Sequence, residues 1–277
     1  MKLGCHVSMA DGIDKAVDRA DALGCDVFQI FTRSPRMWRY RELGEEEVSA
    51  FKRKRKETGI DPVFSHMPYL PNLSSSNMPA YKKSVDTLRL ELTRCNQLGI
   101  PFLVTHLGSH LGKGLEIGIK QIVGAIDSAT EELSRHPVIL LENTSGKTNE
   151  VGSTFEEINT IIESVSTDRI GVCFDTCHGY ARGYDISSAK GVETTIQNIE
   201  ETMGLDRVGL VHMNDSKGEL GSRMDRHKHI GLGYIGEDGF KAIMKSSLIE
   251  KPMVLETPIN DIRDDKGNLL KLRELAA

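Results

Sequence analysis

Two sequence patterns alternate along the whole chain. Short runs rich in β-branched and aromatic residues, typical of buried strands, are separated by longer amphipathic stretches typical of helices. Strands are predicted at residues 3–7, 26–31, 61–66, 101–106, 137–143, 169–175, 207–214 and 251–257. Helices are predicted to begin near Asp11, Gly44, Met78, Leu115, Thr154, Ser187, Gly236 and Asp261. Strand–helix units in this number and length predict an α/β fold, a (β/α)8 TIM barrel, as one domain over residues 1–277. A doubly wound open sheet is the alternative.

Several predicted helices have recognisable ends. Ser153 and Glu156 have the spacing of a capping box, and Ser187 can cap the helix that follows it. Gly24, Gly59 and Gly99 lie where helices should stop, because glycine readily adopts the left-handed conformation that ends a helix.

The composition is that of a water-soluble globular protein, with 39% hydrophobic and 27% charged residues. No apolar run approaches the roughly 20 residues of a membrane span, and the N-terminus lacks the regions of a signal peptide. We therefore expect a cytoplasmic protein. The 5 cysteines are odd in number and scattered, which indicates reduced thiols. Cys173 alternates toward the core and is expected to be a small buried hydrophobe.

Residue types that ligate metals recur at the ends of the predicted strands. The third to eighth strands end at His66, His106, Glu142, Asp175, His212 and Glu256, and His178, Asp225 and His227 lie in the loops that follow. Successive strand-end residues are 40, 36, 33, 37 and 44 residues apart, one strand–helix unit each. Because the carboxyl ends of barrel strands converge on one mouth, we expect all nine side chains to face one cavity.

The chemistry of this set indicates a metal cluster. Imidazole and carboxylate ligands without thiolate suit catalytic zinc, manganese or iron. One histidine at a strand end is more often structural, but independent structural roles do not account for six such ends in succession. The set exceeds what one catalytic ion needs, and bridging carboxylates at Glu142 and Glu256 would let it serve three ions.

The net charge of −5 argues mildly against a nucleic-acid partner. Three divalent ions would add about +6 to the about −4 of the four carboxylates, which leaves the cavity near +2. The same ions bring the whole chain to about +1, so an anionic substrate such as a phosphodiester is favoured.

The other histidines carry weaker signals. His136 begins a strand and is expected to be structural, as is His229. His6 and His110 are candidates either for supporting the metal ligands or for packing.

Two basic segments lie at the same mouth. The segment 32–41 (TRSPRMWRYR) combines arginines with Trp38 and Tyr40, residue types that contact phosphates and stack on bases. The segment 216–229 adds Lys217, Arg223, Arg226 and Lys228 around two of the predicted ligands. The alternative interpretation of each segment is a solvated charged loop.

Motifs along the whole chain resemble the endonuclease IV family of apurinic/apyrimidinic endonucleases. They are HMPYL (66–70), THLGSH (105–110), LLENTSG (140–146), GVCFDTCHGYARGYD (171–185), HMNDSKGELGSRMDRHKHIGLGYIG (212–236) and VLETP (254–258). Leu107, Met213 and Asp11 depart from residues common in the family, but none of them is a predicted ligand.

The resemblance implies a TIM barrel with three zinc ions. The first ion would be held by His66, His106 and bridging Glu142, the second by Glu142, Asp175, His212 and Glu256, and the third by His178, Asp225 and His227. Glu142 or Glu256 would orient or deprotonate the nucleophile. The family resemblance also implies that Arg36 and Tyr69 enter duplex DNA around a flipped abasic nucleotide. The implied reaction is hydrolysis 5′ to the abasic site, which leaves a 3′-hydroxyl and a 5′-deoxyribose phosphate, with trimming of blocked 3′ ends.

Two other functions stay open at this point. Related barrels isomerise or epimerise sugars with one or two metals, and would not need the Asp225–His227 pair or the arginine-rich segment. A lesion-binding protein without catalysis would use the same loops. We expect a monomer, because the mouth must admit a bent duplex.

Overall fold

Eight parallel strands close into a barrel in the computed structural model, which describes residues 1–131, 133 and 137–277. The barrel strands are β1 (Lys2–His6), β2 (Val27–Ile30), β3 (Val63–His66), β4 (Phe102–His106), β5 (Val138–Glu142), β6 (Ile170–Asp175), β7 (Val208–His212) and β10 (Pro252–Leu255). Their order round the barrel is β1-β10-β7-β6-β5-β4-β3-β2. Each predicted strand is confirmed to within two residues at either end. The closed sheet confirms the TIM barrel and excludes the open-sheet alternative.

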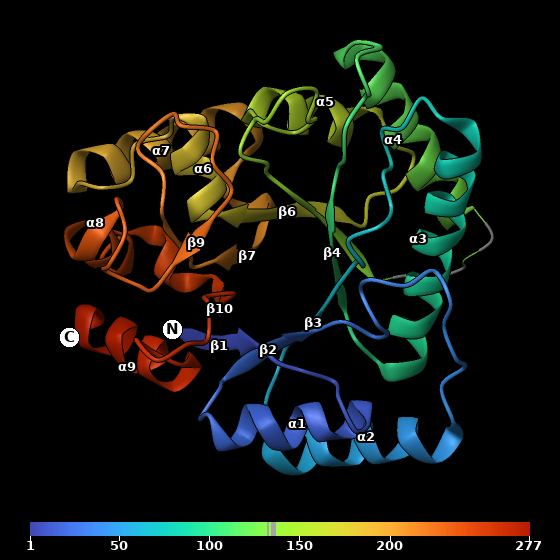
Figure 1. Cartoon of the computed structure of the whole chain (residues 1–277), viewed down its shortest axis with the longest axis horizontal. Helices are drawn as coiled ribbons and strands as arrows, with labels where there is room; N and C mark the ends of the chain where they lie inside the picture. The colour runs from blue at the N-terminus through green and yellow to red at the C-terminus, as the bar shows by residue number, and fades with distance from the viewer. Residues whose placement is uncertain (132, 134–136) are drawn as a thin grey trace.

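Helices surround the strands on the outside (Figure 1). They are α1 (Ile13–Ala22), α2 (Glu45–Thr58), α3 (Met78–Leu98), α4 (Leu115–Thr130), α5 (Phe155–Ser164), α6 (Thr176–Arg182), α7 (Ala189–Met203), α8 (Gly236–Met244) and α9 (Asp265–Ala276). Helix α1 shows why they form: its buried residues Ile13, Ala16, Val17 and Ala20 recur on one face at helical spacing. Among the described residues, no helix combines the length and the hydropathy that a membrane span requires.

Some predicted helix boundaries are wrong by one to four residues. Thr154, not Ser153, caps α5 by accepting a hydrogen bond from the Glu157 amide, and Ser188, not Ser187, caps α7. The last helix begins at Asp265 because the Asp264 side chain caps it. The predicted stops are confirmed, since Gly24, Gly59 and Gly99 all have positive φ.

A short helix and a pair of short strands were not predicted from the sequence. Helix α6 follows β6 directly, because the Asp175 side chain caps it by accepting from the His178 amide at 2.8 Å. Between β7 and β10, the antiparallel strands β8 (Asp215–Ser216) and β9 (His227–Lys228) pair with each other and bring His227 back toward the barrel. Helix α6 and strand β8 each lie where the chain leaves the carboxyl end of a barrel strand.

The inside of the barrel has an apolar layer. Its buried members, here called the inner core, are Val27, Phe64, Val104, Leu140, Cys173, Leu210 and Val254. Cys173 is fully buried in this layer, as predicted. A larger core fills the space between the outer strand faces and the helices. The inner core lies below the carboxyl end of the barrel, and the strand-end polar side chains lie above it.

Candidate metal centre

A ring of polar side chains lies directly above the inner core. Side chains two residues apart on a strand point to the same face. Accordingly, Val27 is followed by Gln29, Phe64 by His66, Val104 by His106, Leu140 by Glu142, Cys173 by Asp175, Leu210 by His212 and Val254 by Glu256. The two-residue period therefore places the predicted strand-end residues at one mouth of the barrel. It also places Gln29 there, a residue that the sequence analysis did not predict.

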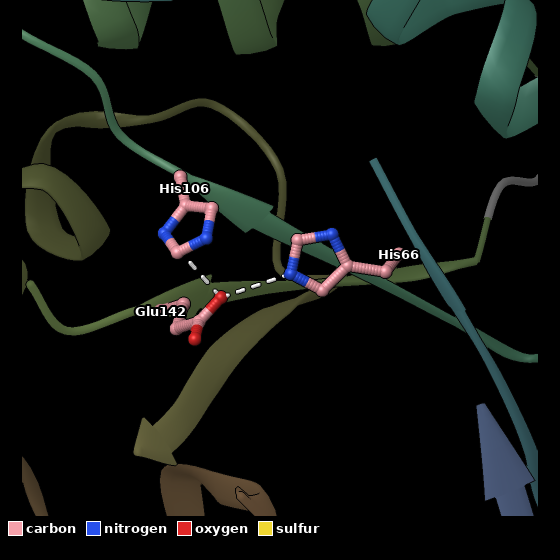
Figure 2. Close-up of side chains that lie close together, drawn as sticks. All are labelled: His66, His106 and Glu142. Atoms are coloured by element: carbon pink, nitrogen blue, oxygen red, sulfur yellow. Dashed lines mark hydrogen bonds and ion pairs between the residues drawn. The ribbon is translucent and has the colours of Figure 1, made fainter. Parts of the chain in front are cut away.

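His66, His106 and Glu142 form the first group (Figure 2). The Glu142 Oε2 atom is 3.0 Å from His66 Nε2 and 3.5 Å from His106 Nδ1. His66 Nδ1 lies 2.7 Å from the Met67 carbonyl oxygen, which can only accept, so Nδ1 carries a hydrogen. A neutral His66 therefore turns the lone pair of Nε2 toward a carboxylate, and a cation between the two would satisfy both.

Glu142 also belongs to a second group, with Asp175, His212 and Glu256. Its other oxygen, Oε1, is 3.1 Å from His212 Nδ1. The same nitrogen is 3.5 Å from Glu256 Oε2 and 3.8 Å from Asp175 Oδ2. Glu142 and Asp175 are fully buried. Glu142 thus has one oxygen in each group, which is the arrangement of a bridging carboxylate.

His178, Asp225 and His227 form the third group. His178 Nε2 is 3.2 Å from Asp225 Oδ1, and His178 Nδ1 is 3.0 Å from the Asn143 carbonyl oxygen. His227 Nδ1 donates to the Glu256 carbonyl oxygen at 3.0 Å. Its Nε2 is buried without a hydrogen-bond partner among the described residues. A buried lone pair without a partner is costly unless an ion occupies the site.

A further set, Asp175, Cys177 and His227, also lies within ligating distance. Burial and the nearby Asp175 raise the pKa of the Cys177 thiol well above its usual value. Its Sγ donates to the Arg226 carbonyl oxygen at 3.7 Å, whereas the other three groups consist of imidazoles and carboxylates alone.

The electrostatics keep Glu142 ionised. Burial raises the pKa of Glu142, but the facing imidazoles of His106 and His212 lower it by more, so the pKa lies well below its usual value. Burial lowers the pKa of His178, but Asp175 and Asp225 raise it by more, to about 10. Each shift reflects a close pair of imidazole and carboxylate, and a divalent cation bound between such partners would take the place of the shared proton.

The model of a family described as "Xylose isomerase-like TIM barrel" matches residues 17–275. The "Probable endonuclease 4" of Methanoculleus marisnigri is 48% identical over 99% of this chain and 98% of its own length. That of Cenarchaeum symbiosum is 49% identical over the whole of both chains. The crystal structure of endonuclease IV from Thermus thermophilus has a TM-score of 0.87 and 36% identity, covering 99% of this chain and 97% of that one.

The chain belongs to the endonuclease IV family.

A D-tagatose 3-epimerase-like protein is also similar in structure, with a TM-score of 0.70 over 99% of this chain, but at 17% identity. At that identity the likeness shows the shared barrel alone. The endonuclease IV relatives, in contrast, match this chain at nearly three times that identity over its full length.

The candidate metal-binding groups of this endonuclease IV family member open into a cavity of about 410 Å³. It is lined by His6, His66, Tyr69, His106, His178, Asp225, Leu255, Glu256, Thr257, Ile259, Asp265 and His227. Tyr69 is 59% exposed at the rim, and its ring lies 5.1 Å from that of Phe31. The Tyr69 amide donates to the Pro35 carbonyl oxygen at 3.1 Å, so the loop that carries exposed Arg36 is tied to the cavity rim.

The arginines of segment 32–41 divide into exposed and buried ones. Arg36, Arg39 and Arg41 are exposed, but Arg33 is only 4% exposed and its Nε donates to Glu91 Oε1 at 2.7 Å. Arg33 therefore cannot reach a phosphate. In segment 216–229, Lys217, Arg223 and Arg226 are exposed and Lys228 is half-buried.

The remaining histidines have separate environments. His6 lines the cavity, with Nδ1 3.4 Å from Glu256 Oε1. His229 is buried and hydrogen-bonded to Asn260 and Asn268, which confirms the structural role expected for it. His110 accepts from the Gly114 amide within its loop. His136 lies outside the described residues.

Sequence reasoning also missed Lys147 and Asn214. Lys147 Nζ is 2.7 Å from Asp225 Oδ2, on the side of the carboxylate away from His178. The Asn214 amide nitrogen donates to Asp175 Oδ2 at 2.7 Å, and its Oδ1 accepts from the Glu256 amide at 2.9 Å. Neither residue type marks a metal site by itself, so no pattern in the sequence singles them out.

Proposed function

We propose that this chain is a zinc-dependent apurinic/apyrimidinic endonuclease of base excision repair. It hydrolyses the phosphodiester bond 5′ to an abasic site in double-stranded DNA, which leaves a 3′-hydroxyl and a 5′-deoxyribose phosphate. Repair of blocked 3′ ends is part of the same proposal. Membership of the endonuclease IV family supports a hydrolase that acts on DNA.

One observation carries the proposal most directly. His66, His178 and His227 each donate one ring N–H to a main-chain carbonyl oxygen and turn the other nitrogen toward the carboxylates. This is the arrangement in which a hydrogen bond fixes the tautomer of a metal-ligating histidine. Three imidazoles arranged this way, with ionised carboxylates facing them, fit metal ions better than any network of hydrogen bonds alone.

The proposed ligand sets follow the three groups. His66, His106 and Glu142 would hold the first zinc, Glu142, Asp175, His212 and Glu256 the second, and His178, Asp225 and His227 the third. When bound, such ions supply Lewis-acid stabilisation of a phosphodiester and activation of water near neutral pH.

The chain's own residues position the reactants. Glu142 is fully buried and belongs to two groups, so it would be a ligand shared by two ions. The Glu256 side chain is 20% exposed to the cavity and is the carboxylate available to orient the nucleophile or take its proton. Exposed Arg36 would bind a backbone phosphate, and the Tyr69 ring would occupy the space beside an extruded abasic nucleotide.

The proposal extends to the organisation and setting of the chain. The ligands are distributed over β3 to β10, so the chain is proposed to act as one domain over residues 1–277 and as a monomer. All five cysteines are free and buried, which suits the reducing conditions of the cytoplasm.

The ligand variants test the mechanism. Glu142→Ala and Glu256→Ala are each expected to lower incision of an abasic duplex by at least about a hundredfold, and Glu142→Ala also to lower zinc content below three ions per chain. Glu57→Ala on the exposed face of α2 is the matched control and should cut normally. Undiminished cutting by Glu142→Ala or Glu256→Ala would contradict the proposed mechanism.

A further inference from the structure

Gln29 is the member of the polar ring that is neither histidine nor carboxylate. It lies on β2 and is fully buried. Its side chain makes three contacts: Nε2 is 2.6 Å from Glu256 Oε1 and 2.9 Å from His6 Nδ1, and Oε1 is 2.9 Å from His212 Nε2. Two of these partners belong to the second metal group.

Hydrogen-bond chemistry fixes which way the Gln29 amide points. The ionised Glu256 carboxylate can only accept, so the amide nitrogen must face it. The second N–H of that nitrogen meets His6 Nδ1, which therefore accepts. The amide oxygen is left for His212, whose Nε2 must then carry a hydrogen. Turning the amide over would set two acceptors against each other at 2.6 Å.

The consequence falls on His212. With its hydrogen on Nε2, the His212 ring presents the lone pair of Nδ1 to Glu142, Glu256 and Asp175. In His66, His178 and His227 a main-chain carbonyl oxygen fixes the tautomer. For His212 a side chain fixes it instead, so the interaction can be removed by substitution.

Gln29 acts on Glu256 as well. By binding Oε1, it leaves Oε2 as the oxygen that lies 3.5 Å from His212 Nδ1. One buried amide thus sets both the tautomer of one proposed ligand and the rotation of another.

We propose that Gln29 is a positioning residue for the second metal site, acting through His212 and Glu256. The inference rests on the proposed function in assuming that three ions are bound and that this group holds one of them. Removal of a hydrogen-bond partner behind a metal ligand typically weakens metal affinity by about 10 to 100-fold. Gln29 should therefore control retention of one ion and leave the other two unaffected.

The test is chelator competition on the zinc-loaded and cobalt-loaded protein. Gln29→Met, which has similar length but no hydrogen bonds, should release one ion about 10 to 100-fold more readily, with a change in the visible cobalt spectrum. Gln197→Met, on the exposed face of α7, is the matched control and should retain all ions as the parent does.

A second variant and a second readout separate positioning from folding. Gln29→Glu keeps the size and the acceptor for His212 but sets a carboxylate against Glu256, so it should also weaken one ion while the His212 nitrogen NMR shifts keep the Nε2–H tautomer. In Gln29→Met those shifts should lose that tautomer preference. If Gln29→Met does not fold, ion retention in Gln29→Glu and the His212 nitrogen NMR shifts of the parent protein test the inference instead.

Three results would overturn the inference: unchanged ion retention in both variants, equal loss of every ion, or a parent His212 with its hydrogen on Nδ1. A parent that holds no metal would instead contradict the proposed function. A parent that holds three ions and cuts DNA, with variants that retain metal normally, would contradict the role of Gln29 alone.

Discussion

The guanidinium group of Arg33 lies buried against the carboxylate of Glu91, with Nε 2.7 Å from Oε1. Glu91 is fully buried on α3, and its other oxygen accepts from the Thr32 hydroxyl at 2.6 Å. Arg33 also donates to the carbonyl oxygens of Met37 and Trp38. A charged pair inside the protein thus holds the base of the arginine-rich loop.

Breaking this pair should be costly. Glu91→Ala leaves the Arg33 charge buried without its partner, so the free energy of unfolding should fall by about 3–5 kcal/mol. Chemical denaturation measures the change. Glu57→Ala removes an exposed partner on α2 and should cost about 0–1 kcal/mol. Equal losses of unfolding free energy in the two variants would show that the buried pair stabilises the protein no more than an exposed pair does.

The exposed part of the same loop should bind DNA. Arg36→Ala and Tyr69→Ala are each expected to weaken binding of an abasic duplex by about tenfold, since a phosphate or stacking contact contributes about 1–3 kcal/mol. Trp38 is the only tryptophan of the chain and is 39% exposed on this loop, so its fluorescence reports binding directly. Arg53→Ala, exposed on α2, is the control, and metal content should stay at the parent value. Parent-like titration curves for both loop variants would contradict these contacts.

Metal removal should destabilise the whole protein. The chelated chain retains the buried carboxylates of Glu142 and Asp175, both of which face His212. An ion present at about a thousand times its dissociation constant stabilises the folded state by about 4 kcal/mol. The melting temperature should therefore fall on chelation and return on addition of zinc. A melting temperature insensitive to chelator would show that the groups do not bind metal in the folded chain.

Stability should also depend on the ionisation of Asp265 at the start of α9. Burial and the neighbouring Asp264 raise the pKa of Asp265 to about 6, whereas an unfolded aspartate titrates near 3.9. The folded state therefore holds the proton more tightly, and the stability from this group is complete below about pH 3.9 and lost as the pH rises through about 6.

Asp265→Asn should accordingly stabilise the protein at pH 7.5 and not at pH 4. A shift of about two pKa units corresponds to about 3 kcal/mol, and partial exposure of the side chain reduces the expected gain to about 1 kcal/mol. Denaturation of the metal-free parent and variant at both pH values measures it. A gain of the same size at both values would contradict the assignment to ionisation.

The barrel could be predicted from the sequence because two regular patterns along the chain indicate it. Alternation within a strand marks the buried faces, and a regular spacing of strand ends places residues such as His66 and Glu142 at one mouth. The nine predicted ligands do lie within three compact groups. What the sequence could not supply are contacts between distant strands: Gln29 reaches Glu256 across 227 residues of chain and His212 across 183.

Local competition explains the other differences. Neighbouring serine, threonine and aspartate residues can each cap a helix, and Thr154 rather than Ser153 caps α5 because its side chain accepts from the Glu157 amide. Arg33 and Arg36 look alike in a basic segment, yet one is buried by Glu91 on α3 and the other is exposed. Asp11 adopts the left-handed conformation (φ 65°), which glycine adopts without the steric cost of a side chain.

The most direct test of the account is incision of a duplex that carries a single abasic site. The metal-loaded protein should cut one strand on the 5′ side of that site and leave a 3′-hydroxyl end, and chelator should abolish the cut until zinc is restored. The matched intact duplex should stay whole. Failure to cut at the abasic site, or cutting that persists in chelator, would contradict the central claim that a metal cluster at the carboxyl ends of the barrel strands acts on damaged DNA.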